Sequence, residues 1–227
     1  MTTSVLEKLC CQIPWCQPAI LESTLELALE IAREGREGRR IGTLFTLGKA
    51  DAVLAASRPL ILDPLVGHAP AQTHITDPDL RGTIKELAQL DGAFVISEAG
   101  TIVAACRYLD ASVEQIELPL GLGSRHLAAA SVSQRLGAIA IVVSESGVVR
   151  VFYDGQLEAA LIPELWLLDR HHAQLGRRDV EGQHHSVDVP TVKPVGRERK
   201  ARIDVVRVAR DTREETKDLR LTRSVAR

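Results

Sequence analysis

Two short stretches decide the fold: DGAFVI at residues 91–96 and GLGSRHLAAA at residues 121–130. The first leads an acidic residue, a glycine and an alanine into an apolar run typical of a strand covered on both faces. The second is a glycine-rich turn that leads an Arg-His pair into the start of a helix. Backbone N–H groups, the helix dipole and the Arg all favour anions there. Together the stretches predict a nucleotide site with a carboxylate, a phosphate cradle and a bound metal.

The residues around these stretches predict two β-hairpins and a helix between them. Each hairpin consists of two apolar runs separated by a polar or glycine-containing turn. The four runs are residues 92–97 with 101–108, and residues 138–143 with 148–153. Residues 124–136 carry an apolar face at helical spacing, and Gly137 stands where a C-terminal cap is expected. Asp154-Gly155 is a further hairpin signal.

Upstream of residue 91, helical and strand-like patterns alternate. Apolar residues recur at helical spacing from Ala19, and Gly35 and Gly38 end that helix. The other expected elements are a strand at 41–47, a short helix at 50–56, an edge strand at 60–62 and a helix at 83–90; the last apolar face lies at 159–168. Helices interleaved with hairpins indicate an α/β fold with a mixed β-sheet flanked by helices.

Length and charge suggest how the chain is divided. Its 227 residues suffice for one large domain, or one domain with a tail. We expect an N-terminal leader at residues 1–18, a domain at 19–169 and a basic, mobile tail at 170–227. The tail holds fifteen Lys and Arg against nine Asp and Glu, whereas the rest of the chain is acidic. The overall net charge of −2 argues against a nucleic-acid partner.

The sequence also bears on where in the cell the protein is located and on the state of its cysteines. No apolar run approaches the roughly 20 residues of a membrane span, and the N-terminus lacks the pattern of a secretory signal. We therefore expect a cytoplasmic protein without a membrane partner. The four cysteines, Cys10, Cys11, Cys16 and Cys106, fit neither a disulfide framework nor a paired zinc motif. Free thiols in a mobile N-terminus are the favoured interpretation, with a metal site at Cys10, Cys11 and Cys16 as the alternative.

From about Ala19 to Gly155 the chain resembles the diadenylate cyclases, whose domain also forms the N-terminal part of the DNA-integrity scanning protein. The Asp-Gly-Ala motif of that family is met by residues 91–93, and its Gly-(Thr/Ser)-Arg-His turn by residues 123–126. Residues 105–109 and 141–147 are similar to the segments that follow these motifs. The resemblance is to the soluble subgroup and implies a single diadenylate cyclase-like domain.

The resemblance implies synthesis of cyclic di-AMP from two ATP molecules, with release of two pyrophosphates. Asp91 would orient or deprotonate the 3′-hydroxyl and bind Mg²⁺ or Mn²⁺. The substrate would be bound by residues of both motifs and of two strand ends: Gly92, Ala93, Tyr108, Leu109, Gly123, Ser124, Arg125, His126, Ser144 and Glu145. Tyr108 and Leu109 would line the adenine pocket. Because one protomer offers one ATP site, the active unit would be a homo-oligomer with face-to-face sites.

One position departs from the family pattern. Many members read Arg-His-Arg, whereas this chain reads Arg125-His126-Leu127. The leucine leaves the phosphate site with one fewer cation, or it replaces a residue that served packing. The alternative function is therefore a catalytically inactive nucleotide-binding regulatory protein with the same fold.

Overall fold

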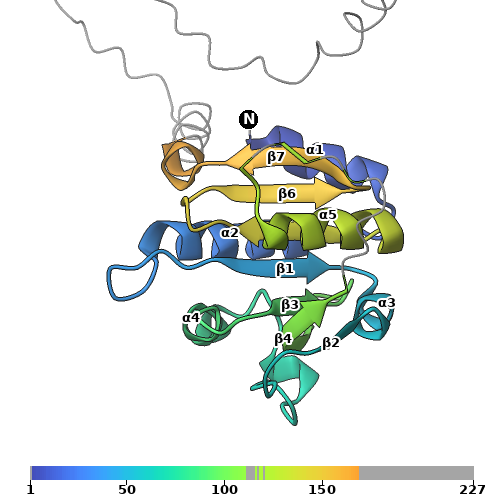
Figure 1. Cartoon of the computed structure of the whole chain (residues 1–227), viewed down its shortest axis with the longest axis vertical. Helices are drawn as coiled ribbons and strands as arrows, with labels where there is room; N and C mark the ends of the chain where they lie inside the picture. The colour runs from blue at the N-terminus through green and yellow to red at the C-terminus, as the bar shows by residue number, and fades with distance from the viewer. Residues whose placement is uncertain (1, 111–115, 117, 120, 169–227) are drawn as a thin grey trace, which may run out of the picture. The chain divides into compact units, whose positions relative to one another are not determined.

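A seven-stranded mixed sheet lies at the centre of the protein, in the order β2-β4-β3-β1-β5-β6-β7 (Figure 1). The computed structural model describes residues 2–110, 116, 118–119 and 121–168. Strands β1 and β3 pair in parallel, and the other neighbouring strands pair antiparallel. The strands are β1 (Thr43–Leu47), β2 (Ser57–Pro59), β3 (Ala93–Ile96), β4 (Ile102–Leu109), β5 (Ile139–Val143), β6 (Val149–Tyr153) and β7 (Gln156–Leu161).

Helices cover both faces of this sheet. The helices are α1 (Thr2–Gln12), α2 (Pro18–Glu34), α3 (Ala50–Ala55), α4 (Pro78–Leu87) and α5 (Ser124–Leu136), with a short 3₁₀ turn at Pro70–Gln72 and further helical residues at 163–168. Apolar side chains of α1, α2 and α4 share one buried cluster, and those of α3 and α5 share the other. The described residues therefore form three layers, with the sheet in the middle.

Alternation along the central strands produces these two clusters. In β5, Ile139, Ile141 and Val143 face the cluster with α2, whereas Ala140 and Val142 face the cluster with α5. Every residue of β1, β3 and β5 is buried. Successive side chains of a strand point to opposite faces, so a strand covered on both sides is mostly apolar; the exceptions in β1 are Thr43 and Thr46.

Most of the local predictions are confirmed. The predicted fold class is correct, because the sheet is mixed and helices flank it. Helix α5 has the predicted bounds of 124–136, and Gly137 ends it in the left-handed conformation, with φ 66°. Both predicted hairpins are present as β3–β4 and β5–β6, and the Asp154-Gly155 signal marks the turn into β7.

Two predictions are wrong. We expected residues 1–18 to be a loosely attached leader, but most of them form α1, and Leu9 and Ile13 are fully buried in the core. We also expected an edge strand at 60–62; the edge strand is β2, which pairs with β4 through residues 57–59. Apolar composition misplaced that strand because backbone pairing with β4, rather than burial of side chains, fixes an edge strand.

The cysteines near the N-terminus are part of this packing. Cys16 is buried, and its Sγ lies 2.6 Å from Sγ of Cys10. Burial and the neighbouring Cys10 raise the pKa of the Cys16 thiol to about 12. In the described part of the chain, no cluster of three or more His, Cys, Asp or Glu side chains has metal-binding geometry. The alternative of a metal site at Cys10, Cys11 and Cys16 is therefore not supported.

Two further predictions concern membrane-spanning helices and the C-terminal tail. Within the described residues, no helix is long and apolar enough to cross a membrane. The predicted basic tail at 170–227 lies outside the described residues, and the proposed domain boundaries remain predictions.

Candidate active site

The site begins where Asp91 and Gly92 enter β3. Gly92 has φ 115°, and a Cβ atom at this position would lie 2.5 Å from the carbonyl carbon of Cys106. The partner strand is irregular at the same point: Ala93 pairs with Arg107 and Val95 with Ala104, and Cys106 has φ 55°. An extra residue in one strand bends it and changes where its side chains point. Gly92 and this β-bulge together allow the backbones of β3 and β4 to approach closely next to Asp91.

The start of helix α5 forms the second part of the site. Gly123 is the N-cap residue, and no side chain caps this end of the helix. The backbone N–H groups of His126 and Leu127 both donate to the Gly123 carbonyl. The leading N–H groups of a helix have no acceptor within the helix. This uncapped helix start therefore leaves backbone donors for an anion.

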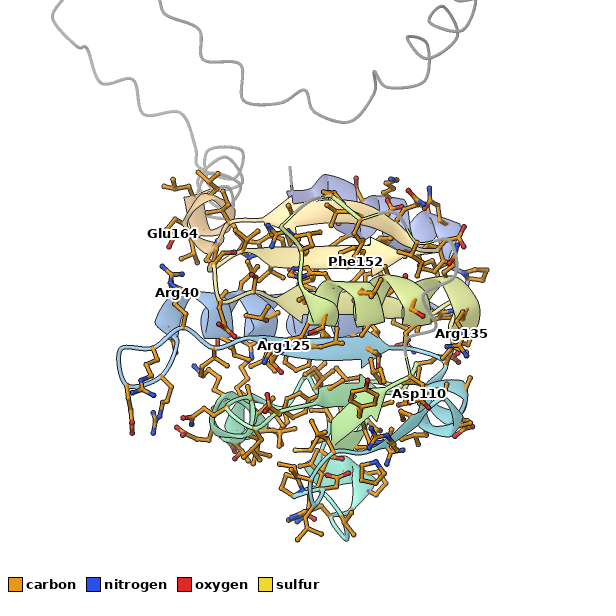
Figure 2. The ribbon with its side chains drawn as sticks, viewed as in Figure 1. Arg40, Asp110, Arg125, Arg135, Phe152 and Glu164 are labelled. Atoms are coloured by element: carbon orange, nitrogen blue, oxygen red, sulfur yellow. The ribbon has the colours of Figure 1, made fainter. Side chains whose placement is uncertain are left out.

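Arg125 connects the two parts. It lies at the start of α5 (Figure 2). Its Nη2 is 3.4 Å from Oδ1 of Asp91. Its Nη1 is 3.1 Å from Oε1 of Glu145, in the turn after β5. The Asp91 and Glu145 side chains are 76% and 67% exposed, so both carboxylates are open to solvent or to a ligand. Gly42 leaves room for this contact, because a Cβ atom there would lie 2.6 Å from Arg125 Nη1.

Two adjoining cavities flank Arg125. The larger cavity has a volume of about 450 Å³ and lies between the start of β3, the end of β4 and the first turns of α5. The smaller cavity has a volume of about 210 Å³ and lies between the glycine turn before α5 and the end of β5. Ser124 and Arg125 line both cavities. A ligand in either cavity can therefore contact Ser124 and Arg125.

Every predicted site residue lines one of these cavities. The larger cavity is lined by Asp91, Gly92, Ala93, Tyr108 and Leu109, the smaller by Gly123, His126, Ser144 and Glu145, and both by Ser124 and Arg125. These residues come from segments that are separated by up to about fifty positions. Their convergence supports the choice of residues, while the role of each remains a prediction.

The wall of the larger cavity contains an aromatic side chain held by a cation. The Tyr108 side chain is exposed at 45%, whereas Leu109 is buried. The Arg58 guanidinium carbon lies 4.4 Å from the centre of the Tyr108 ring. A guanidinium at this distance is attracted to the face of the ring, which fixes its orientation. Tyr108 thus offers a stacking surface at the mouth of the cavity.

His126 differs from the other residues of the site because it is buried, with 7% of its surface exposed. Burial lowers the pKa of its imidazole, and the neighbouring charges of Arg150 and Arg125 lower it further. The Phe152 ring packs edge-on against it, with ring centres 6.2 Å apart. This environment therefore favours the neutral imidazole over the imidazolium, and the ring packs against Phe152.

Sequence reasoning missed several residues of the cavity walls. They are Leu44, Leu60, Arg107, Gly121, Leu127, Ala128, Val142 and Val143. Arg107 donates hydrogen bonds to the Ser57 hydroxyl and to the carbonyls of Leu54 and Ser57, so it fastens β2 against β4. Leu127, which departs from the family pattern, forms part of the apolar wall of the larger cavity. Gly121, Leu127 and Ala128 lie in the glycine-rich stretch at 121–130, and Arg107, Val142 and Val143 lie in the family-like segments, so the sequence marked these segments without giving these residues a site role. Leu44 and Leu60 look like ordinary apolar residues in the sequence, and no local signal identifies them.

The carboxylates of the site do not form a closed metal cage. Among the described residues, no three metal-binding side chains converge. Mg²⁺ and similar hard cations are often held by one or two carboxylates and completed by substrate phosphates and water. Asp91 and Glu145, on either side of Arg125, fit that type of site.

Known proteins share this domain. Residues 30–157 match the family model described as DAC, DisA bacterial checkpoint controller nucleotide-binding. Two relatives named diadenylate cyclase are similar: the protein of Methanocaldococcus jannaschii is 48% identical over 142 residues, and that of Haloferax volcanii is 39% identical over 150 residues. These alignments cover 62% and 66% of this chain, but 45% and 55% of the two relatives. The chain therefore spans about half the length of these relatives.

A solved structure gives a further match. The crystal structure of DacA from Staphylococcus aureus is 24% identical to this chain, with a TM-score of 0.44. The match covers 67% of this chain and 94% of that chain.

Proposed function

Because this chain belongs to the diadenylate cyclase family, we propose that it condenses two ATP molecules into cyclic di-AMP and releases two pyrophosphates. One observation carries the proposal: the residues of two separate motifs converge on two adjoining cavities that share Ser124 and Arg125. A nucleoside triphosphate needs a larger, partly apolar space for its base and a polar, cationic space for its phosphates. The larger and the smaller cavity supply these two environments side by side.

The reaction forms and breaks the same kinds of bond twice. In each half, the 3′-oxygen of one ATP bonds to the α-phosphorus of the other, and the bond from that phosphorus to the pyrophosphate oxygen breaks. Asp91 orients the attacking hydroxyl or accepts its proton, which then passes to solvent. Most of the rate acceleration comes from positioning and charge neutralisation, as in other phosphoryl transfers.

The remaining residues bind the substrate. Arg125, His126 and the backbone N–H groups at the start of α5 hold the phosphates, together with Ser124 and Ser144. The adenine lies in the larger cavity against Tyr108 and Leu109, one exposed and aromatic, the other buried and apolar. ATP displaces Arg125 from at least one of its two carboxylates, because the phosphates compete for the same guanidinium.

A divalent cation, Mg²⁺ or Mn²⁺, is part of this proposal. It would neutralise phosphate charge and lower the energy of the charged transition state when bound. Asp91 would be its protein ligand, and Glu145 is the other carboxylate available to hold it. Both carboxylates are more than half exposed, so they are accessible for this purpose.

We further propose that two protomers act with their sites face to face. One protomer has a single set of motifs, yet the product contains two AMP units joined by two bonds. Asp91 and Tyr108 are both exposed, so a second protomer can reach them. Mixing the wild-type protein with excess Asp91→Asn should lower product below that expected from the wild-type chains alone. Unchanged activity per wild-type chain, with subunit exchange verified, would contradict the paired arrangement.

The experiment that tests the activity is direct. The purified full-length chain is incubated with ATP and either Mn²⁺ or Mg²⁺, and cyclic di-AMP is measured by mass spectrometry. Asp110→Asn is the matched control for Asp91→Asn, because it makes the same change of charge at a residue outside both cavities. ATP binding without any product would overturn the cyclase assignment and favour the nucleotide-binding regulatory protein.

A further inference from the structure

A second arginine, Arg150, lies behind the proposed phosphate site. It belongs to β6, which packs against α5, and its Nη1 is 3.4 Å from Nε2 of His126. Arg150 is partly buried, and it lines neither of the two cavities around Arg125. Arg150 therefore contacts a residue of the smaller cavity without lining that cavity itself.

The charge of Arg150 is not balanced by a carboxylate in the described part of the chain. Arg125 contacts two carboxylates, and Arg81, on α4, contacts Glu26 and Glu30. No such ion pair is found for Arg150 among the described residues, and burial lowers its pKa. A partly buried cation without an anion is costly, since its charge is only partly hydrated. Its positive potential is therefore available to an anion that binds nearby.

The contact with His126 also determines where the imidazole proton lies. A guanidinium has only donors and stays protonated in proteins, so Arg150 must donate and His126 Nε2 must accept. In a neutral ring whose Nε2 accepts, the proton is on Nδ1. That Nδ1 is buried and has no hydrogen-bond partner among the described residues. A buried donor without a partner destabilises the protein and calls for an explanation.

We infer that Arg150 is a positioning residue that holds His126 in the Nδ1-protonated form and adds an unbalanced positive charge behind the start of α5. The inference rests on the proposed function, since the acceptor for His126 is then a phosphate oxygen of the substrate in the smaller cavity, which His126 lines. The Phe152 ring packs edge-on against the imidazole, and the buried Nδ1 must become accessible to the smaller cavity when a phosphate binds. His126 therefore acts as a hydrogen-bond donor, and it is not a general base.

The first test measures the tautomer directly and needs no activity. Long-range ¹H–¹⁵N spectra of the full-length wild-type protein distinguish the two neutral tautomers of each histidine. The His126 signals are assigned by their absence in His126→Asn. We expect a proton on Nδ1, and added pyrophosphate should shift the Nδ1 signal. A proton on Nε2, or an Nδ1 signal unchanged at saturating pyrophosphate, would overturn the inference.

The second test uses matched arginine variants. Arg150→Met removes the charge and the donor, and Arg150→Lys retains both. In Arg150→Met the Nε2-protonated form should appear, and the affinity for pyrophosphate, measured by calorimetry, should fall roughly tenfold. Arg150→Lys should retain most of the Nδ1-protonated form and most of the affinity for pyrophosphate. Arg135→Met is the control, because Arg135 lies at the opposite end of α5 (Figure 2). Wild-type pyrophosphate affinity in a folded Arg150→Met would overturn the inference.

These outcomes separate the inference from the proposed function. Failure to form cyclic di-AMP, with the Nδ1 proton and the pyrophosphate effect present, would reject the cyclase activity and keep the role of Arg150 in anion binding. Formation of cyclic di-AMP with the His126 proton on Nε2 would keep the cyclase activity and reject the proposed role of Arg150. If Arg150→Met does not fold, the spectra of the wild-type protein and of Arg150→Lys decide the question.

Discussion

The two helix layers of this protein use charged side chains in different ways. Between α2 and α4, Arg81 contacts Glu26 and Glu30 at 2.7 Å each, and Lys85 contacts Glu30 and Glu34. At the start of α5, Arg125 reaches two mostly exposed carboxylates, and Arg150 has no carboxylate partner among the described residues. The first set is a network whose charges satisfy one another. The second set leaves donors and charge available, which is what a site for phosphate groups requires.

This difference leads to opposite expectations for mutations. Substitutions at the start of α5 should reduce activity with little effect on stability, because the side chains are exposed or face the cavities. Substitutions between α2 and α4 should reduce stability and leave the activity unchanged. The largest effect is expected at Asp91 and the smallest at Glu34.

Asp91→Asn should reduce the turnover of ATP to cyclic di-AMP by about 10³-fold, since a carboxylate that accepts a proton typically contributes 10²–10⁴-fold. The affinity for ATP should stay within roughly tenfold, because the amide keeps the shape of the side chain. Steady-state kinetics and calorimetry measure the two quantities. Turnover at the parent rate would show that Asp91 is not the catalytic carboxylate.

Arg125→Ala should weaken ATP binding and turnover together, with kcat/KM lower by about 10–100-fold, because hydrogen bonds to charged groups contribute roughly 1.5–3 kcal/mol. The loss is spread over the ground and transition states, since the guanidinium binds phosphate in both. His126→Ala should have a smaller effect. Calorimetry with ATP tests the claim, and unchanged affinity in Arg125→Ala would move the phosphate site elsewhere.

Arg81→Ala tests the other layer. It removes two charged hydrogen bonds from a side chain that is 25% exposed. We expect a loss of about 1 kcal/mol in the free energy of unfolding and a Tm lower by about 2–4 °C. Catalytic activity per folded protein should not change. A substantial loss of activity with normal stability would contradict the separation of the two regions.

Glu34→Gln should have the smallest effect, and it should depend on pH. The hydrogen bond from Lys85 lowers the pKa of Glu34 below its ordinary value of 4.5. A lowered folded-state pKa stabilises the protein above the ordinary value, and this contribution is lost as the pH falls through the lowered value. The variant should therefore be slightly less stable than wild type near pH 7, with the difference vanishing in acid. Denaturation curves at several pH values measure it; a difference that persists below the lowered pKa would contradict this account.

Local sequence patterns were sufficient for most elements. The apolar spacing of residues 124–136 together with Gly137 defined α5, because helix periodicity and a glycine cap depend on neighbouring residues. The turns at 98–100 and 144–147 likewise defined the two hairpins, since each pairs strands adjacent in the chain. The motifs identified residues that line both cavities for the same reason: the chemistry of each motif is local.

The remaining features depend on contacts between distant parts of the chain. The burial of α1 requires a core built mainly from α2 and the sheet, and β2 is defined by its pairing with β4 some fifty residues later. The β-bulge at Cys106 arises where Gly92 admits the opposite backbone. Arg150 and His126 are twenty-four residues apart in the sequence. The motif that contains His126 does not include Arg150.

The sequence by itself thus determined the strand and helix patterns, the two motifs and the chemistry that these residues offer. Only the tertiary structure decided that β1 pairs with β3 in parallel, that one arginine contacts both Asp91 and Glu145, and that another lies within 3.4 Å of the His126 imidazole. The physical reason is that periodicity and capping act over a few residues, whereas charge balance and proton position depend on which side chains the fold brings within hydrogen-bond distance.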